Sequence, residues 1–222
     1  NKTEFSRVKT PHLIHNSFLQ KTFTDKVSLS GNNYSIISGK SEIHHDTSTA
    51  IFMLSPIFKS GNYTARSSTI EVNFKDEKII ADGNVIFKIS GKNIAATEIR
   101  GKTLFFSMKS HDAQIIDNIE LLQKGKRANS KYLSYNDKTM TAVLTQKVQV
   151  LFKKGGSLLK EQSYKNIKNP EAKKALKENA TLTCNALNLS IKTGSATAEG
   201  NVFVEQKNKR AKSDYASYDD EK

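Results

Sequence analysis

The sequence predicts an all-β protein of stacked antiparallel strands, and three observations support this fold class. Ile70, Val72 and Phe74 would share one face of the segment TIEVNF, and the polar residues between them would share the other face. Turn-forming segments such as KDEK, YNDKT and KTGS separate alternating segments of this kind at short intervals. A related pattern then recurs along the chain, as is typical of stacked architectures. The alternating segments are therefore predicted to be half-buried strands in a repeating meander.

The repeat is clearest in two short phrases, ADGNVIFK at residues 81–88 and AEGNVFVE at residues 198–205. Successive copies begin at Gly61, Gly91 and Gly125, which are 30 and 34 residues apart. The Gly-Asn pair in each phrase predicts a corner or a bulge, because glycine adopts positive φ values or lets two backbones approach closely. The strand after the corner would return to the same apolar face in every copy.

The domain organisation follows from the two stretches that break this pattern. Residues 1–25 have no clean period and contain Pro11, so we expect a linker or a loosely docked arm there, followed by one β domain over residues 26–222. Residues 155–179 are predicted to be an insertion. Within the insertion, Asn169 as N-cap and Pro170 at the first helical position predict a short helix over residues 170–178.

Composition limits the classes of function. The net charge of +13 would suit an anionic partner, such as a nucleic acid, a membrane surface or a phosphorylated ligand, but it equally fits a plain lysine-rich surface. Cys184 is the single cysteine, which excludes an intrachain disulfide and a cysteine-based metal site. The apolar runs, such as AIFML at residues 50–54, are too short to span a membrane. The chain starts at Asn1, and we expect it to be a processed form without an upstream leader or anchor.

Motifs that carry catalysis or cofactor binding were not found. The sequence has no nucleophile elbow, no zinc-protease helix, no phosphate loop and no dinucleotide fingerprint, so we expect neither an enzyme nor a cofactor. His44, His45 and Asp46 could bind a metal or form a polar turn, and successive strand residues point to opposite faces, which disfavours the metal. The lysines are spread along turns and solvent faces, so nucleic-acid binding is not predicted.

The remaining signal is the apolar stripe itself, which is predicted to line one common interior. Two uses of this interior remain open: a solid core filled by its own side chains, and a groove that holds acyl chains. The residues predicted to line it are Val72, Phe74, Val85, Phe87, Ile89, Leu104, Phe106, Met108, Val148, Val150, Phe152, Leu189, Ile191, Val202 and Val204.

Several of these phrases together resemble a known family. The phrase AEGNV at residues 198–202, the phrase KSDYA at residues 212–216 and the pair Tyr218-Asp219 resemble the OstA-like family, the periplasmic lipopolysaccharide-transport proteins LptA and LptC. Residues 34–107 are similar to the LptC type and residues 178–222 to the LptA type.

The resemblance implies a β-jellyroll of stacked, V-shaped antiparallel strands around an open trough. It implies a periplasmic protein that carries lipopolysaccharide with the acyl chains inside and performs no catalysis. It also implies an anchor to the inner membrane by a segment outside this chain, and partners among other transport components. An unpaired terminal strand would pair with those partners or with further copies, head to tail, to bridge the inner and outer membranes. The alternative is a structural β-solenoid or filament protein with a solid core and no ligand.

Overall fold

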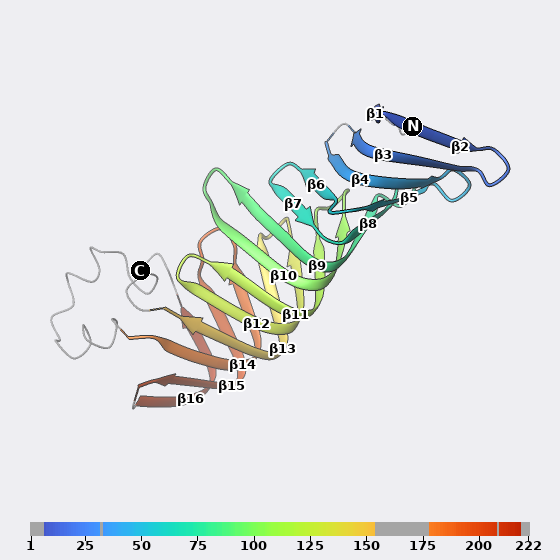
Figure 1. Ribbon diagram of the computed structural model, residues 1–222. Helices are drawn as coiled ribbons and strands as arrows, with labels where there is room; N and C mark the ends of the chain where they lie inside the picture. Colours follow the sequence, from blue (N-terminus) through green and yellow to red (C-terminus); the bar gives the residue numbers. More distant parts are fainter. Residues whose placement is uncertain (1–6, 32, 154–177, 208, 219–222) are drawn as a thin grey trace. The chain divides into compact units, whose positions relative to one another are not determined.

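The computed structural model describes residues 7–31, 33–153, 178–207 and 209–218, and all regular structure within these ranges is β-strand (Figure 1). All but the last residue of the helix predicted over residues 170–178 lies outside the described residues. The strands are β1 (Arg7–Lys9), β2 (His12–Asn16), β3 (Lys21–Ser30), β4 (Ser35–His44), β5 (Thr49–Met53), β6 (Ile57–Ser60), β7 (Tyr63–Arg66), β8 (Thr69–Asn73), β9 (Lys78–Gly91), β10 (Ile94–Ser107), β11 (Ala113–Gln123), β12 (Lys126–Asn136), β13 (Thr141–Phe152), β14 (Ala180–Ser190), β15 (Ala196–Gln206) and β16 (Lys209–Tyr218).

The chain forms two compact units. Unit one comprises Asn1–Ile89 and Arg100–Ile115, and unit two comprises Ser90–Ile99 and Ile116–Lys222. Strands β9, β10 and β11 therefore contribute residues to both units. The single domain expected over residues 26–222 stays a prediction.

In unit one, the strands β4, β5, β8, β9, β7 and β6 pair antiparallel in a closed circuit. Strand β4 pairs with β5 through Lys40–His44 and with β6 through Ser35–Ile37. Strand β9 pairs with β8 through Lys78–Asp82 and with β7 through Ile86–Ile89. We call the side of the circuit with β5 and β8 the first layer and the side with β6 and β7 the second layer. The antiparallel all-β prediction is confirmed, but the open trough implied by the resemblance is a closed circuit of strands in unit one.

The N-terminal segment forms strands where a linker or a loosely docked arm was expected. Strand β1 pairs with the second half of β3, and β2 pairs with its first half. Every residue of β1 is exposed, and so are the first four residues of β2. Because neither strand has a buried face, their sequences show no alternation, and the pairing rests on backbone hydrogen bonds.

In unit two, β11 to β16 form a ladder in which each strand pairs with the next. Strand β13 ends opposite the start of β14, with Phe152 paired to Ala180. The predicted insertion therefore connects two neighbouring strands and leaves their pairing continuous. The strands bend near their middles, so unit two also has two sides, which we call arm A (with Lys126 and Phe152) and arm B (with Ser190 and Tyr218).

The corner predicted from Gly-Asn is confirmed in both phrases. The φ angles are 76° at Gly83 and 53° at Asn84, and 72° at Gly200 and 50° at Asn201. Two successive residues in the left-handed region turn the strand sharply. Strand β9 exchanges its partner β8 for β7 across the first corner, and the β15–β16 pairing shifts register across the second.

Two further corners have the same geometry without glycine. Asp117 and Asn118 have φ values of 61° and 54°, and Gln146 and Lys147 have φ values of 64° and 62°. Asn and Asp tolerate this region, whereas Gln and Lys adopt it at a cost of about 1–2 kcal/mol each. Pairing with the neighbouring strands therefore imposes the corner, even on residues that do not favour positive φ.

Substitution of Gly83 tests the close approach at the corner. A Cβ at Gly83 would lie 2.7 Å from Ser68 Oγ and 2.9 Å from Ser68 Cβ, whereas a Cβ at Gly61, also at positive φ, would meet nothing within 4 Å. We expect Gly61→Ala to lower the free energy of unfolding by about 1 kcal/mol and Gly83→Ala to lower it by about 2–4 kcal/mol. Urea unfolding measures both, and Ser68→Gly should recover part of the loss in the Gly83→Ala background. Equal losses at the two glycines would contradict the close approach.

Candidate functional site

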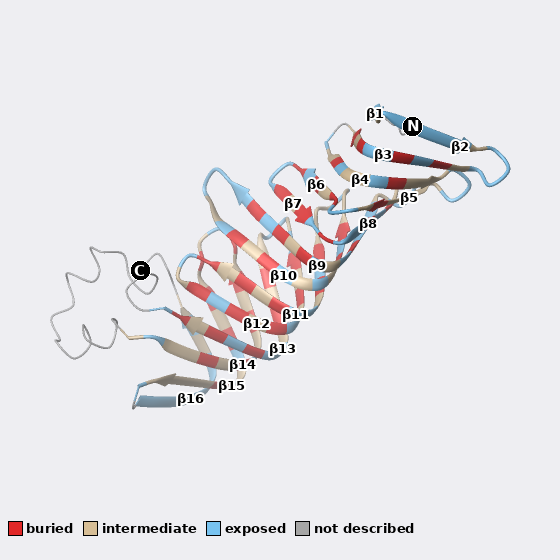
Figure 2. Ribbon diagram, viewed as in Figure 1, coloured by how far each residue is buried: buried red, intermediate tan, exposed pale blue. Residues whose placement is uncertain are grey.

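Each unit has an apolar interior between the bent halves of its strands, and these interiors are the candidate site. Buried and exposed positions alternate along the strands (Figure 2). All of the residues predicted to line the interior are buried except Met108 and Val204, which are partly exposed. The buried ones are Val72, Phe74, Val85, Phe87, Ile89, Leu104 and Phe106 in unit one, and Val148, Val150, Phe152, Leu189, Ile191 and Val202 in unit two. Their burial is found, and their contact with a lipid remains a prediction.

Further apolar side chains share this burial and were not singled out from the sequence. Phe52 and Phe58 are fully buried on the short strands β5 and β6. The alternation of Ala50 and Phe52 within AIFML could have identified one of them, but the segment was considered only as a short apolar run. Others are Ile36, Ile79, Ile99, Ile115, Leu133, Tyr135 and Leu144.

In unit one, aromatic rings join the two layers. The hydrogen bond from Met108 N–H to the Glu77 carbonyl (2.8 Å) places the end of β10 beside the first layer. Phe106, near this end of β10, lies 5.6 Å from the ring of Tyr63 and 5.8 Å from that of Phe87, both on the second layer. Tyr63 and Phe87 are stacked at 5.9 Å. Such pairs contribute about 0.5–1.5 kcal/mol each beyond area burial, so the interior of unit one is held closed by protein side chains.

In unit two, polar and aromatic contacts join the free ends of the two arms, and we call this cluster the mouth. Lys126 Nζ donates to the Gly194 carbonyl at 2.5 Å and lies 4.3 Å from the ring centroid of Tyr218. Phe152 of arm A lies 5.5 Å from the same ring on arm B. Gln123 Nε2 donates to the Ile191 carbonyl at 3.4 Å. Lys126 and Gln123 are both buried, so the mouth excludes water as well as joining the arms.

The single cysteine is a natural probe of this interior. Cys184 is buried on β14 and is paired in register with Val148 on β13. Burial raises the pKa of the Cys184 thiol above its ordinary value, against a smaller opposing effect of a backbone hydrogen bond at Glu199. The thiol should therefore react slowly unless the arms separate.

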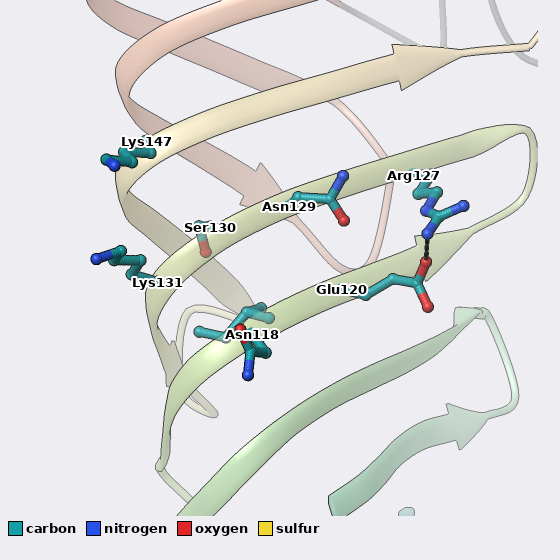
Figure 3. Close-up of a pocket in the computed structure, with 8 residues that line it drawn as sticks. Asn118, Glu120, Arg127, Asn129, Ser130, Lys131 and Lys147 are labelled. Carbon is teal, nitrogen blue, oxygen red and sulfur yellow. Dashed lines mark ion pairs between the residues drawn. The ribbon is translucent and has the colours of Figure 1, made fainter. Parts of the chain in front are cut away.

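A polar pocket of about 430 Å³ also occurs in unit two, away from the mouth (Figure 3). Arg127 forms an ion pair with Glu120, and Lys131 and Lys147 lie at the corner side of the same strands. With three cations and one carboxylate, the lining carries a net positive charge, which agrees with the lysine-rich surface expected from composition.

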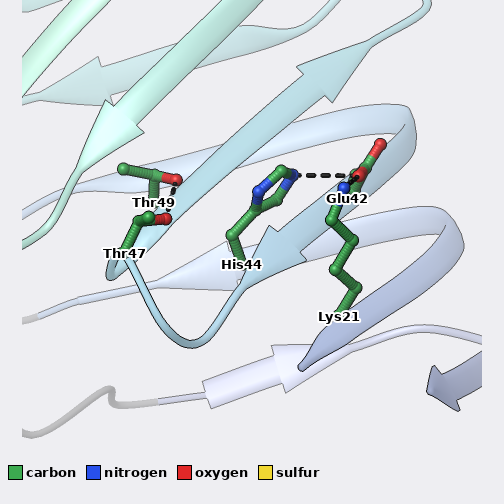
Figure 4. A network of polar contacts seen from close by, with 5 residues as sticks. All are labelled: Lys21, Glu42, His44, Thr47 and Thr49. Atoms are coloured by element: carbon green, nitrogen blue, oxygen red, sulfur yellow. Dashed lines mark hydrogen bonds and ion pairs between the residues drawn. The ribbon is translucent and has the colours of Figure 1, made fainter. Parts of the chain in front are cut away.

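The histidines considered as metal ligands have other partners. His44 Nε2 lies 2.9 Å from Glu42 Oε1, to which Lys21 Nζ donates at 2.7 Å (Figure 4). His45 Nε2 instead lies 2.8 Å from Thr22 Oγ1. Within the residues that the structure describes, no group of three or more His, Cys, Asp or Glu side chains could hold a metal ion.

The Lys21–Glu42 pair predicts a pH-dependent part of the stability of unit one. The hydrogen bond from Lys21 is the largest cause that lowers the pKa of Glu42, and partial burial opposes it. Because the folded pKa lies below the unfolded one, this stabilisation is complete above about pH 4.3 and is lost as pH falls through the lowered value. We expect Lys21→Met to lower the free energy of unfolding by up to about 1 kcal/mol at pH 7, with the difference vanishing in acid. Urea titrations across this pH range measure it, and Lys59→Met, at an exposed lysine paired opposite Ser35 and Thr64, should show no such pH dependence.

These features define a class: an all-β protein in which one unit is a closed circuit of six antiparallel strands and the other a ladder of bent antiparallel strands, each with an apolar interior. The structure is similar to the crystal structure of LptH from Pseudomonas aeruginosa, the LptA-homologous periplasmic component of its lipopolysaccharide transport device. The similarity has a TM-score of 0.43 and 13% sequence identity, and it covers 46% of this chain and 75% of that chain. No protein-family model matches the chain, and no curated protein matches it. Among the described residues, no helix has the length and apolar character needed to cross a membrane.

Proposed function

We propose that this chain is a periplasmic lipid carrier of the lipopolysaccharide-transport type, which holds acyl chains between the bent halves of its strands. The observation that carries the proposal is that each unit has an apolar interior lined by alternating buried side chains. The residues that would contact the acyl chains are those named above. The recurring corner and the phrases that resemble the OstA-like family support the same assignment.

The physical requirement is to hide acyl chains from water while they cross an aqueous space. Shielding a dozen methylenes is worth about 10 kcal/mol, at roughly 0.8 kcal/mol each. Because Phe87, Leu104 and Ile191 are fully buried by protein atoms, a lipid would have to displace side chains or separate the two sides. The side-chain contacts of the mouth in unit two are the place where the arms would part. Lys126, which belongs to the mouth, would then face the phosphates of the lipid.

The edges of the sheet suggest how such a carrier would join its partners. Strand β16 is the last strand of the unit two ladder, and its residues from Lys209 to Tyr215 are exposed. An exposed strand edge presents backbone groups to another chain. Pairing there with another transport component, or head to tail with a further copy, would form the bridge between membranes that the function needs.

A structural β-filament protein is the second candidate, and one observation favours it. Apart from Met108 and Val204, the side chains predicted to line the interior are 7% exposed or less, as in a solid core that needs no ligand. The two candidates differ in whether the interior ever contacts lipid.

Photo-crosslinking separates them. A photoreactive phenylalanine analogue placed at Val85, Phe87 or Phe106 would be activated in the periplasm of a Gram-negative host. Lipid transport predicts adducts with lipopolysaccharide from these positions, and none from Phe105, the outward-facing neighbour of Phe106. Native mass spectrometry of the extracted protein should also show lipid A-type species. If none of the three inner positions gave an adduct and the extracted protein had a ligand-free mass, the lipid-carrier function would be excluded. The structural filament protein would then remain as the candidate.

A further inference from the structure

We propose that the polar pocket of unit two binds a phosphorylated saccharide, with Lys131 and Lys147 on the phosphate (Figure 3). The pocket has a volume of about 430 Å³, which lies within the range of small-molecule sites. None of its lining residues belongs to the mouth, so a ligand there requires no opening of the apolar interior. The inference is therefore independent of lipid carriage and goes beyond the proposed function.

The two lysines are neighbours at the corner of strands β12 and β13. The segments 130–131 and 146–148 lie opposite each other where the register of this pairing shifts. Lys131 belongs to one segment and Lys147 to the other, and both are exposed and line the pocket. Within the described part of the chain, neither side chain forms an ion pair or a hydrogen bond. Two neighbouring cations without a counter-charge favour the binding of an anion between them.

The lysine at position 147 also departs from the corner pattern. In the four corners described above, the second residue is Asn at positions 84, 118 and 201 and Lys at position 147, and all four have positive φ. Asn tolerates this region, whereas Lys adopts it at a cost. Backbone conformations of this kind gather at binding sites. Lys147 thus places a cation at the pocket, although Asn would fit the corner backbone better.

The remaining polar side chains suit a sugar. The amides of Asn118 and Asn129 line the pocket, and neither forms a side-chain hydrogen bond with another described residue. An amide both donates and accepts, which matches the hydroxyl groups of a saccharide. Glu120, the one carboxylate of the lining, is in an ion pair with Arg127. Three cations and one carboxylate leave a net charge of +2, which is carried by the two corner lysines.

The chemistry of the lining favours a phosphate ester over other anions. An ammonium group binds phosphate as a point charge, whereas a carboxylate is recognised best by the paired donors of an arginine. The arginine of this pocket, Arg127, is already engaged by Glu120. No aromatic residue lines the pocket, whereas single-stranded nucleic acids bind by stacking their bases on aromatic rings. A phosphorylated saccharide is the ligand that both the lysines and the amides fit.

The test is an NMR titration of the isotope-labelled full chain with glucose 1-phosphate, at constant ionic strength because salt screens exposed charges. We expect saturable shifts of the backbone amide signals of Asn118, Asn129 and Lys131, and none with glucose. The Lys131→Gln/Lys147→Asn variant should bind about tenfold more weakly. Lys138→Gln, at an exposed lysine of the same unit that does not line the pocket, should bind like the parent.

Lys147→Asn alone separates binding from folding. Because Asn tolerates positive φ, this substitution should raise the midpoint of urea unfolding while it weakens the binding of glucose 1-phosphate. A loss of binding in a more stable protein cannot come from unfolding.

A free sugar phosphate and the head group of a phosphorylated glycolipid offer the same chemistry to this pocket. Lipopolysaccharide in detergent micelles, added to the complex, distinguishes the two sources. Displacement of glucose 1-phosphate from the pocket signals would assign the site to a lipid head group, and retention would assign it to a free sugar phosphate.

Three results would overturn the proposal. One is the absence of saturable shifts at the pocket signals. Another is equal affinity of the parent and the Lys131→Gln/Lys147→Asn variant for glucose 1-phosphate, with circular dichroism showing both folded. The third is binding of inorganic phosphate as tight as that of glucose 1-phosphate, which would reduce the pocket to an unselective anion site. Because the probe has no acyl chain, none of these results bears on whether the interior carries lipid.

Discussion

Phe87→Glu is expected to lower the free energy of unfolding by about 4 kcal/mol or more, enough to unfold a domain of ordinary stability. Phe87 is fully buried, stacks on Tyr63 and contacts Phe106. The substitution removes these ring contacts and puts a carboxyl group in an apolar site, where burial would favour its neutral form. Urea unfolding followed by circular dichroism measures the loss.

Phe105→Glu is the matched control for this prediction. Phe105 lies next to Phe106 on β10, but it is exposed, so a carboxylate there stays in water. Its effect should be within about 0.5 kcal/mol of zero. If Phe87→Glu were as mild as this control, the interior of unit one would have room for a solvated charge, and the filled interior described above would be wrong.

Lys126→Ala is expected to open the mouth of unit two and to expose Cys184. The substitution removes the hydrogen bond to the Gly194 carbonyl and the contact with the Tyr218 ring, which together join arm A to arm B. If the substitution lowers the free energy of local opening by about 1.4 kcal/mol, the open state is populated about ten times more often. We therefore expect alkylation of Cys184 by a water-soluble reagent to be about tenfold faster or more than in the parent.

Lys131→Ala provides the comparison, because Lys131 is exposed and lies outside the mouth. It should leave the alkylation rate unchanged at every pH. Rates for all the proteins should rise with pH, since the thiolate is the reacting form. A folded Lys126→Ala protein that reacts no faster than the parent would show that reagent does not reach Cys184 through the mouth.

The sequence predicted those parts of the fold that local pattern determines. Alternation identified the buried face at Val85 and Phe87, and Gly-Asn identified two corners. The corner at Gln146 and Lys147 was missed, because neighbouring strands impose it on residues that do not prefer positive φ. The strands before residue 25 were missed because exposed edge strands need no alternation.

The contacts across the interior were beyond sequence reasoning for a different reason. Lys126 and Gly194 are far apart in the chain, and only the bending of the strands brings them together. The same holds for Phe152 and Tyr218. No local sequence pattern indicates which strand ends meet, so the contacts that close the mouth could not have been predicted.

The regular spacing of the corners has a consequence for how such a chain can evolve. In unit two, Asn118 and Lys147 are 29 residues apart. Lys147 and Asn201 are 54 apart, a span that includes the 24 residues of 154–177, so 30 residues separate them in the described chain. Each interval supplies two strands, or roughly 10 Å of stack. Duplication or loss of one such segment would change the length of the protein in fixed increments while preserving every remaining strand pairing. The number of copies of the segment in the gene would then set the length of the protein.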